Sequence, residues 1–258
     1  MKFALKSSLL GLSLVTAFAS NLLAPIAYAE DKHAVHWDYQ GEGKPENWDK
    51  LKEEYATCKL SKEQSPINIE TKAVAKAALP ALAFGYTPTA AEIVNNGHTI
   101  QINLANAGSL KIAADEYKFL QFHFHTPSEE QIDGKNYPLV AHFVHKSEAG
   151  KLAVVAVLFK VGKKNETLAP VFAALPAKEG ASNKLANIDA KAILPTGQKY
   201  YAFMGSLTTP PCSDGVRWQV LKDPVEVSAE QLASFTKLYK MNARPVQPLN
   251  GRKVQVSE

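Results

Sequence analysis

The 258-residue chain has few cysteines, no excess of charge of one sign, and no long apolar run after its first thirty residues. Two cysteines cannot build a small disulfide scaffold, and 14 glycines are too few for a collagen-like chain. With 46% hydrophobic residues, the chain is also too apolar to be intrinsically disordered. A net charge of +4 without a run of Lys and Arg gives no reason to expect a nucleic-acid partner. A chain of this length can bury a full core without metals or cross-links.

The first thirty residues are predicted to contain a secretory signal peptide. Lys2 and Lys6 precede an apolar run at 9–19, and the segment ends in Ala-Tyr-Ala at 27–29. A basic start, a short apolar stretch and a small-x-small exit are typical of a cleaved signal. The alternative is an uncleaved anchor, but the run is shorter than the ~20 apolar residues that span a bilayer. We therefore expect residues 1–29 to be removed and the mature protein to be periplasmic or secreted, with no membrane partner.

Export changes the interpretation of the two cysteines, Cys58 and Cys212. In a cytosolic enzyme they would be interpreted as free, catalytic or metal-binding residues, whereas an oxidising compartment favours one disulfide between them. Two buried thiols are the alternative. The sequence predicts the disulfide.

The mature chain is predicted to be dominated by strands. Residues 98–104 and 109–113 flank a short Asn-Ala-Gly segment, which is typical of a hairpin. The almost continuously apolar stretch 152–161 predicts a central strand covered on both faces. In the segment 118–125, side chains alternate between a face with Leu120, Phe122 and Phe124 and a face with Phe119, Gln121, His123 and His125.

Helices are predicted at three places, 48–57, 166–175 and 229–241. Ser228 is a candidate N-cap for the last of them. Because no internal repeat or low-complexity linker interrupts the chain, the sequence predicts one β-dominated domain with peripheral helices.

Three histidines have the arrangement of a metal site. His123 and His125 are two residues apart in a predicted strand, so their side chains leave the same face. His142 lies on the next predicted strand, where an antiparallel neighbour would bring it level with that pair. Three neutral imidazoles with one open position are typical of catalytic zinc, and copper is the alternative metal. A surface pattern without a ligand explains the spacing poorly, since the two histidines flank Phe124 in an apolar strand.

Several longer motifs identify a resemblance that covers nearly the whole mature chain. They are His36-Trp37-Asp38-Tyr39, Gln64-Ser65-Pro66-Ile67-Asn68-Ile69, Asn95-Asn96-Gly97-His98, Gln121-Phe122-His123-Phe124-His125, Ser128-Glu129, Asp133-Gly134, Gly205-Ser206-Leu207-Thr208-Thr209-Pro210-Pro211-Cys212, Asn242-Ala243-Arg244-Pro245 and 245–252. In this order they resemble the α-class carbonic anhydrases of bacterial, exported type.

This resemblance implies one catalytic domain over residues 30–258. The implied fold is α+β and β-dominated, with a central, twisted, mostly antiparallel sheet of about ten strands surrounded by short helices and loops. The implied activity is that of a zinc lyase: reversible hydration of CO2 to bicarbonate by zinc-hydroxide attack, with a histidine proton shuttle. Exported bacterial members are often dimers, so a homodimer is expected, with CO2 and bicarbonate as the small-molecule substrates.

The resemblance also assigns roles to individual residues. The implied zinc ligands are His123, His125 and His142, and Cys58 and Cys212 match the disulfide of exported members. The implied catalytic residues are the gatekeeper Thr208, its partner Glu129 and the proton shuttle His98. Substrate positions are Val144, Val154, Leu207, Thr208, Thr209, Val216 and Trp218. Tyr39, Asn96 and Gln101 match positions along the proton path, while Gln121 and the carbonyl of Asn242 match the hydrogen-bond partners of His123 and His125.

Two positions depart from the family pattern. Val140 stands where a glutamate commonly accepts the N–H of the third ligand, and Glu130 stands where a histidine often follows the Ser-Glu pair. A missing partner of this kind typically costs ~10–100-fold in metal affinity or activity. The sequence therefore predicts weaker zinc binding or a shifted pH profile, unless a water or another side chain substitutes. Glu130 is either such a compensation or a solvated carboxylate.

Two other functions compete with the enzyme. A catalytically inactive, carbonic-anhydrase-like binding module would typically have lost a zinc histidine, and this chain has all three. A periplasmic zinc carrier would not need Thr208, Glu129 and His98 together. The sequence therefore favours the enzyme.

Overall fold

The computed structural model describes residues 36–258, and strands dominate this part of the chain. The predicted signal peptide lies outside the described residues. The strands are β1 Asn68–Ile69, β2 Ala75–Ala77, β3 Leu82–Tyr86, β4 Thr89–Asn95, β5 Ile100–Leu104, β6 Gly108–Ile112, β7 Asp115–His125, β8 Gln131–Ile132, β9 Lys135–Asn136, β10 Leu139–Lys146, β11 Leu152–Val161, β12 Ser182–Ile188, β13 Tyr200–Ser206, β14 Asp214–Leu221, β15 Val225–Val227 and β16 Gln255–Ser257.

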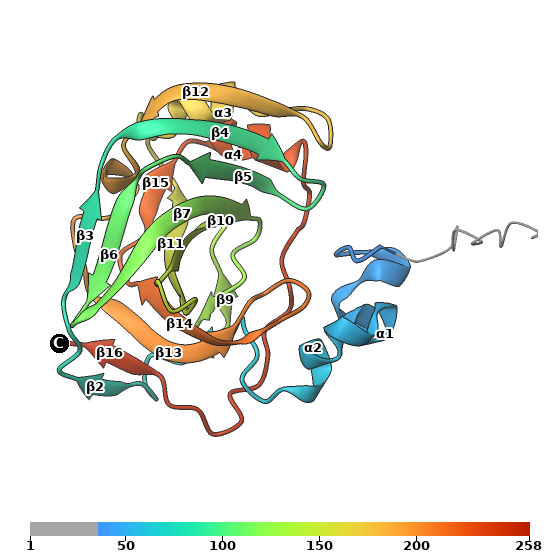
Figure 1. The fold of residues 1–258 in the computed structure, drawn as a ribbon, viewed down its shortest axis with the longest axis vertical. Helices are drawn as coiled ribbons and strands as arrows, with labels where there is room; N and C mark the ends of the chain where they lie inside the picture. The colour runs from blue at the N-terminus through green and yellow to red at the C-terminus, as the bar shows by residue number, and fades with distance from the viewer. Residues whose placement is uncertain (1–35) are drawn as a thin grey trace, which may run out of the picture. The chain divides into compact units, whose positions relative to one another are not determined.

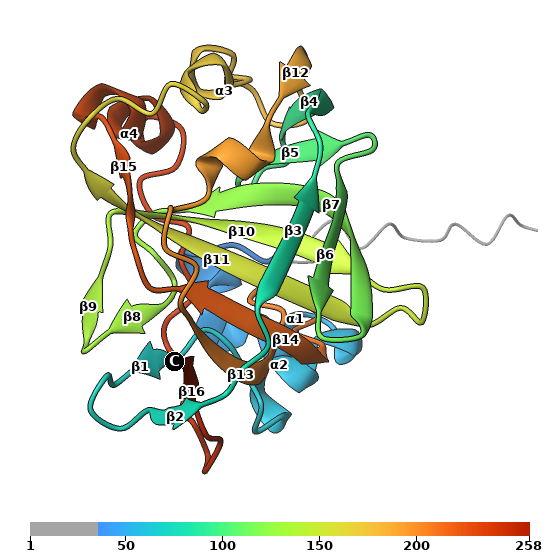
Figure 2. The same cartoon turned by 90° about the vertical axis from the view of Figure 1, so that its left-hand side faces the viewer.

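The strands form one 13-stranded sheet and a separate three-stranded sheet, β1-β8-β9. Ten strands of the large sheet follow one another in the order β12-β4-β5-β7-β10-β11-β14-β13-β16-β2. Pairing is mostly antiparallel, and β11 pairs in parallel with both β14 and β15. Figures 1 and 2 show β7, β10 and β11 side by side in the middle of this sheet. The predicted β-dominated, mostly antiparallel architecture is confirmed.

The helices are short. They are α1 Trp48–Leu51, α2 Thr57–Leu60, α3 Ala169–Ala173 and α4 Ala229–Thr236, with 3-10 turns at Gly41–Gly43, Pro45–Asn47, Glu53–Tyr55 and Ala190–Ile193. The single helix predicted at 48–57 is wrong, because Lys52 is extended (φ −150°, ψ 147°) and separates α1 from the following turn. None of the helices within 36–258 is long and apolar enough to cross a membrane.

The helix predicted at 229–241 begins where expected and ends earlier, at Thr236. Ser228 caps it through a capping box: its hydroxyl accepts a hydrogen bond from the N–H of Gln231, whose side chain binds the N–H of Ser228. The predicted helix at 166–175 is likewise reduced to α3. Both views show α3 and α4 close together at one end of the sheet (Figures 1 and 2).

The hairpin predicted from 98–104 and 109–113 is wrong. The two segments form β5 and β6, but they do not pair with each other: β5 lies between β4 and β7, and β6 lies between β3 and β7. Both bind the same long strand at different positions along it. Length explains the difference, since β7 has 11 residues and can pair with two five-residue strands in succession.

The alternation predicted in β7 holds from Gln121 to His125 and fails before it. Val144 and His145 are consecutive on β10, but they lie opposite Gln121 and Phe119, so Leu120 is the extra residue of a β-bulge. A bulge reverses the alternation, and Phe119 therefore joins the buried core that contains Phe122 and Phe124. Leu120 is left half-buried.

The central-strand prediction for 152–161 is confirmed by β11, whose residues Ala153 to Phe159 are all buried. Its side chains alternate between two apolar clusters, one on each face of the sheet. Val155, Val157 and Phe159 belong to the larger core, and Val154, Ala156 and Leu158 belong to a second cluster on the other face. The second cluster adjoins the site described below.

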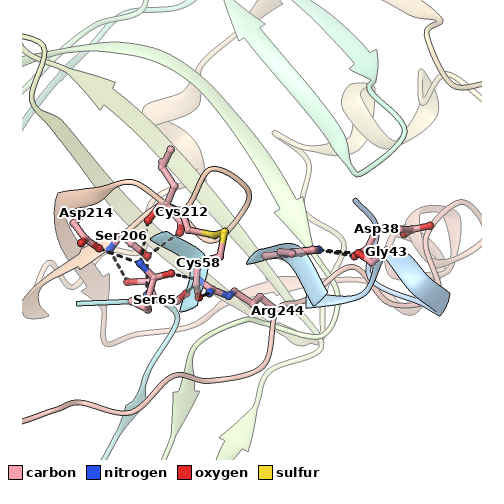
Figure 3. Close-up of a disulfide and its surroundings, with 11 residues drawn as sticks. Asp38, Gly43, Cys58, Ser65, Ser206, Cys212, Asp214 and Arg244 are labelled. Atoms are coloured by element: carbon pink, nitrogen blue, oxygen red, sulfur yellow. Dashed lines mark hydrogen bonds between the residues drawn. A yellow bond between two sulfur atoms is a disulfide. The ribbon is translucent and has the colours of Figure 1, made fainter. Parts of the chain in front are cut away.

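The predicted disulfide is confirmed: Cys58 of α2 is bonded to Cys212, which follows β13, across 154 residues of sequence. The buried Arg244 guanidinium donates from Nη2 to the carbonyl of Cys58 (2.8 Å) and from Nη1 to the carbonyl of Ser65 (2.7 Å). Figure 3 shows this guanidinium beside the sulfur–sulfur bond. The link therefore ties the N-terminal helices to the loop between β13 and β14.

Candidate metal centre

Three imidazoles from two neighbouring strands meet at one point. His123 and His125 lie on β7, where residues two apart share a face, and His142 lies directly opposite His123 on β10. One ring nitrogen of each lies within 4.8 Å of the others. Of residues 36–258, these are the only His, Cys, Asp or Glu side chains grouped in this way.

Hydrogen bonds orient the two imidazoles of β7. Nδ1 of His123 is 2.9 Å from Oε1 of Gln121, which lies on the same face of the strand, and Nδ1 of His125 is 2.7 Å from the carbonyl of Asn242. Each acceptor oxygen requires a proton on Nδ1. Nε2 of both rings is therefore unprotonated and available to a cation.

The third imidazole, His142, has a carboxylate partner that the sequence did not assign. Oε1 of Glu130 is 2.9 Å from Nε2 of His142, and both side chains are buried. Nδ1 of His142 is the nitrogen left for the cluster. Glu130 is therefore not a solvated carboxylate, and of the alternatives left open by the valine at position 140, another side chain contacts His142.

Burial and the neighbouring carboxylates set the pKa values of the three imidazoles. Burial lowers the pKa of His123 to about 3 and that of His125 well below its usual value, and the nearby charge of His142 acts in the same direction. For His142, burial also lowers the pKa, but the charge and hydrogen bond of Glu130 and the charge of Glu129 outweigh it, so its pKa is raised.

The donor set fits a metal ion with a preference for nitrogen ligands. His125 Nε2 is buried without a hydrogen-bond partner, so a neutral donor faces the centre of the cluster unused. The group of three imidazoles contains no thiolate, which favours zinc over copper electron-transfer chemistry. If all three imidazoles bound a tetrahedral ion, one position would stay open, as catalytic zinc sites require.

A buried carboxylate, Glu129, lies next to this cluster. Its Oε2 is 3.5 Å from Nε2 of His125 and 3.8 Å from Nδ1 of His142, while Oε1 accepts a hydrogen bond from the backbone N–H of Arg244 (2.8 Å). Burial raises the pKa of Glu129 to about 7, against the lowering effects of His142, Arg244 and the side chain of Thr208. Thr208, buried after β13, is thus brought together with Glu129.

His98 lies in a stack of aromatic rings. Its ring is nearly parallel to that of Trp37, with centroids 3.5 Å apart, and the exposed ring of His36 stacks at 5.1 Å. Burial first, and then the charge of His36, lowers the pKa of His98 below 6.5. Asn96 shapes the turn, since its Oδ1 accepts hydrogen bonds from the N–H groups of His98 (3.0 Å) and Thr99 (2.9 Å).

The remaining polar candidates, Gln101, Tyr39 and Asn242, differ in the hydrogen-bond partners that they have. Gln101 lies opposite His123 on β5, but its Nε2 donates to Asn103 (2.7 Å). Tyr39 is buried with no partner for its hydroxyl, and burial followed by the charge of Glu129 raises its pKa well above 10. Asn242 joins the two parts of the site, because its amide also donates to the carbonyl of His98 (3.0 Å).

An apolar wall adjoins the imidazoles. The predicted substrate positions Val144, Val154, Leu207, Val216 and Trp218 belong to or pack against one cluster. Val144, Val154 and Trp218 lie opposite one another across β10, β11 and β14, and the Trp218 ring meets His142 edge-on at 4.9 Å. Thr209 is half-buried, and its carbonyl accepts the N–H of Cys212 (2.8 Å).

Sequence reasoning left two contributors unassigned: Glu130, which it named only as a possible compensation for Val140, and the Arg244 N–H that supports Glu129. A signal existed for the first, since Glu130 and Val140 depart from the family pattern together, one gaining a carboxylate and one losing it. No local sequence pattern predicts the contact between the Arg244 N–H and Glu129, because the two residues are 115 positions apart.

Comparison with known proteins identifies relatives along the whole described domain. Residues 43–258 match the sequence model of the eukaryotic-type carbonic anhydrases. A carbonic anhydrase of Pectobacterium carotovorum is 44% identical over 221 residues, covering 85% of this chain and 90% of the relative. One of Klebsiella pneumoniae is 44% identical over 255 residues, covering 96% and 97%. The α-carbonic anhydrase of Thermovibrio ammonificans, solved with the inhibitor sulfanilamide, aligns with a TM-score of 0.84 and 46% identity, covering 86% of this chain and 99% of that one.

Proposed function

Because the chain belongs to the eukaryotic-type (α-class) carbonic anhydrase family, we propose that it is a zinc enzyme that catalyses the reversible hydration of CO2 to bicarbonate. The observation that carries this proposal is the convergence of His123, His125 and His142, each with its second ring nitrogen held by an oxygen. A binding module without catalysis would need no such arrangement.

These three imidazoles are the proposed zinc ligands, through Nε2 of His123 and His125 and Nδ1 of His142. Bound zinc supplies Lewis-acid activation of water, whose pKa falls to about 7 in carbonic anhydrases generally. Neutral ligands suit this chemistry, because they leave the full charge of the ion available to the reacting oxygen.

Thr208 and Glu129 are proposed to orient the reacting water. With Oε1 engaged by the Arg244 N–H, the ionised carboxylate of Glu129 offers Oε2 as an acceptor for the Thr208 hydroxyl. The hydroxyl oxygen of Thr208 then accepts a hydrogen bond from the water, and it disfavours ligands that cannot donate a hydrogen bond. Burial of both side chains excludes bulk water from competing for these hydrogen bonds.

The apolar wall is proposed to hold CO2, which has no net dipole and needs no hydrogen bond to bind. Val144 and Leu207 are half-buried, so they present apolar surface, whereas Val154 and Val216 support them from within the cluster. The edge-on contact of Trp218 with His142 brings this wall against the ligand side of the site.

His98 is proposed to carry the proton away from the reacting water. An imidazole whose pKa is lowered below 6.5 is neutral at pH 7, so it is ready to accept a proton and then to release it. The His98 ring stacks on Trp37 and on the exposed ring of His36, so it lies between the buried cluster and solvent on the proposed proton route. Tyr39, Asn96 and Gln101 are proposed to order the intervening water.

The protein is further proposed to be exported, after removal of residues 1–29, and to act in the periplasm or outside the cell. The Cys58–Cys212 disulfide supports an oxidising compartment. A homodimer remains our prediction from the resemblance to exported members.

The proposal is tested by stopped-flow CO2 hydration on the mature, oxidised protein, before and after zinc chelation. We expect fast hydration that disappears with chelation and returns with added zinc, and a His123→Ala variant that stays inactive under both conditions. If the zinc-loaded protein hydrates CO2 no faster than that variant, the enzyme proposal is refuted and the binding module replaces it.

A further inference from the structure

The side chain at position 140 cannot orient the third imidazole. Val140 lies two residues before His142 on β10, on the same face of the strand. It is fully buried and belongs to the apolar cluster that contains Ile67, Ala156 and Leu158. It offers no acceptor for a ring N–H, so the proton on Nε2 of His142 needs an oxygen from another part of the chain.

Glu130 supplies that oxygen from the loop after β7. Its side chain is fully buried, and Oε1 lies 2.9 Å from Nε2 of His142. Among residues 36–258, His142 is the only hydrogen-bond partner of this carboxylate, since Oε2 has none. A buried carboxylate is costly unless it is paired. Its presence here is therefore explained by the imidazole that it contacts.

The backbone around Glu130 is held on both sides. The carbonyl of Glu130 accepts a hydrogen bond from the Ser128 hydroxyl (2.7 Å), which in turn accepts one from the N–H of Tyr137 (2.9 Å). The next residue, Gln131, begins β8, which pairs with β1 and β9. The carboxylate thus projects from a fixed position, which is what precise orientation of a ligand requires.

We propose that Glu130 is a positioning residue that replaces the absent carboxylate at position 140. By accepting a hydrogen bond from the Nε2–H of His142, it fixes the tautomer and the ring orientation that direct Nδ1 toward the metal. This inference rests on the proposed function, because it assumes that His142 is a zinc ligand.

The test measures zinc affinity by competition with a chromophoric chelator, and the melting temperature of the metal-free protein, on the full mature chain. Glu130→Leu removes both oxygens and leaves a side chain of similar size. In this variant we expect zinc affinity to fall ~10–100-fold. Adding Val140→Glu to that variant should restore most of the affinity, because it returns a carboxylate to the face of His142. The matched control, Glu130→Leu with Val140→Leu, should restore none. Val140→Glu alone should not exceed the wild type.

A purely structural role would give a different pattern. If Glu130→Leu lowers the melting temperature but leaves zinc affinity unchanged, or if the two double variants bind zinc equally, the proposal is overturned. Should Glu130→Leu fail to fold, Glu130→Met removes both oxygens while keeping the length of the side chain, and it tests the same point with the same expected loss of ~10–100-fold.

A His142→Ala control separates this inference from the proposed function. If the wild type binds one zinc per chain and His142→Ala abolishes binding, the metal site stands, and an unchanged affinity in Glu130→Leu refutes the role of Glu130 alone. If the wild type binds no zinc, or if His142→Ala binds it as well, the proposed function fails and this inference with it.

Discussion

Reducing the Cys58–Cys212 bond should lower the free energy of unfolding by about 5 kcal/mol. The link spans 154 residues, and closing a loop of that length removes about 17 cal/mol/K of entropy from the denatured chain on the chain-entropy model. For a domain of this size, that loss corresponds to a melting temperature roughly 10–20 °C lower. Because the uncross-linked denatured chain is also more expanded, the denaturant m-value should rise.

Urea unfolding of oxidised and reduced wild-type protein measures this difference directly. The chain has no third cysteine, so disulfide exchange cannot complicate the comparison. Reduced protein keeps both sulfur atoms in the cluster with Tyr39, Trp48 and Tyr55, whereas a double Cys→Ala variant also loses their packing. The oxidised–reduced difference therefore isolates the cross-link. A value below about 1 kcal/mol would refute the reasoning, since it would mean that the denatured chain is already confined without the bond.

Three further predictions concern single side chains. Burial lowers the pKa of His145 to about 3, so the folded protein does not protonate this imidazole at pH 5. The unfolded chain does protonate it as the pH falls below about 6.5, which favours unfolding. Between pH 6.5 and pH 5 the metal-free wild type should therefore lose about 2 kcal/mol more stability than His145→Gln. Equal losses in urea unfolding at the two pH values would contradict this. Thr208→Val should lower kcat/KM for CO2 hydration by ~10²-fold, while Thr208→Ser, which keeps the hydroxyl, stays close to the wild type; stopped flow that finds both variants alike would exclude the orienting role. His98→Ala should lower kcat by about 10²-fold with kcat/KM unchanged, and imidazole added to the buffer should restore kcat; a variant that imidazole does not rescue would exclude the shuttle.

The fold was predictable where the signal is local. The apolar stretch 152–161 matches the bounds of β11, and Ser228 caps α4 as its sequence position suggests, because both depend on neighbouring residues. The hairpin at 98–113 failed, because strand pairing is chosen among all strands and β7 offers a longer partner than either segment offers the other. The bulge at Leu120 could not be predicted from the segment itself, because it is defined by the pairing register between β7 and β10.

At the candidate site, the sequence by itself determined which side chains are available and that two of them share a face. His123 and His125 project together because the period of a strand is two residues, a property of the backbone alone. The tertiary structure decided whether oxygens from distant segments reach the other two rings, those of His125 and His142. Glu130 reaches His142 from another segment, and Asn242 reaches His125 from 117 residues away. Such pairs depend on how distant segments pack and on the cost of leaving a buried N–H or carboxylate without a partner.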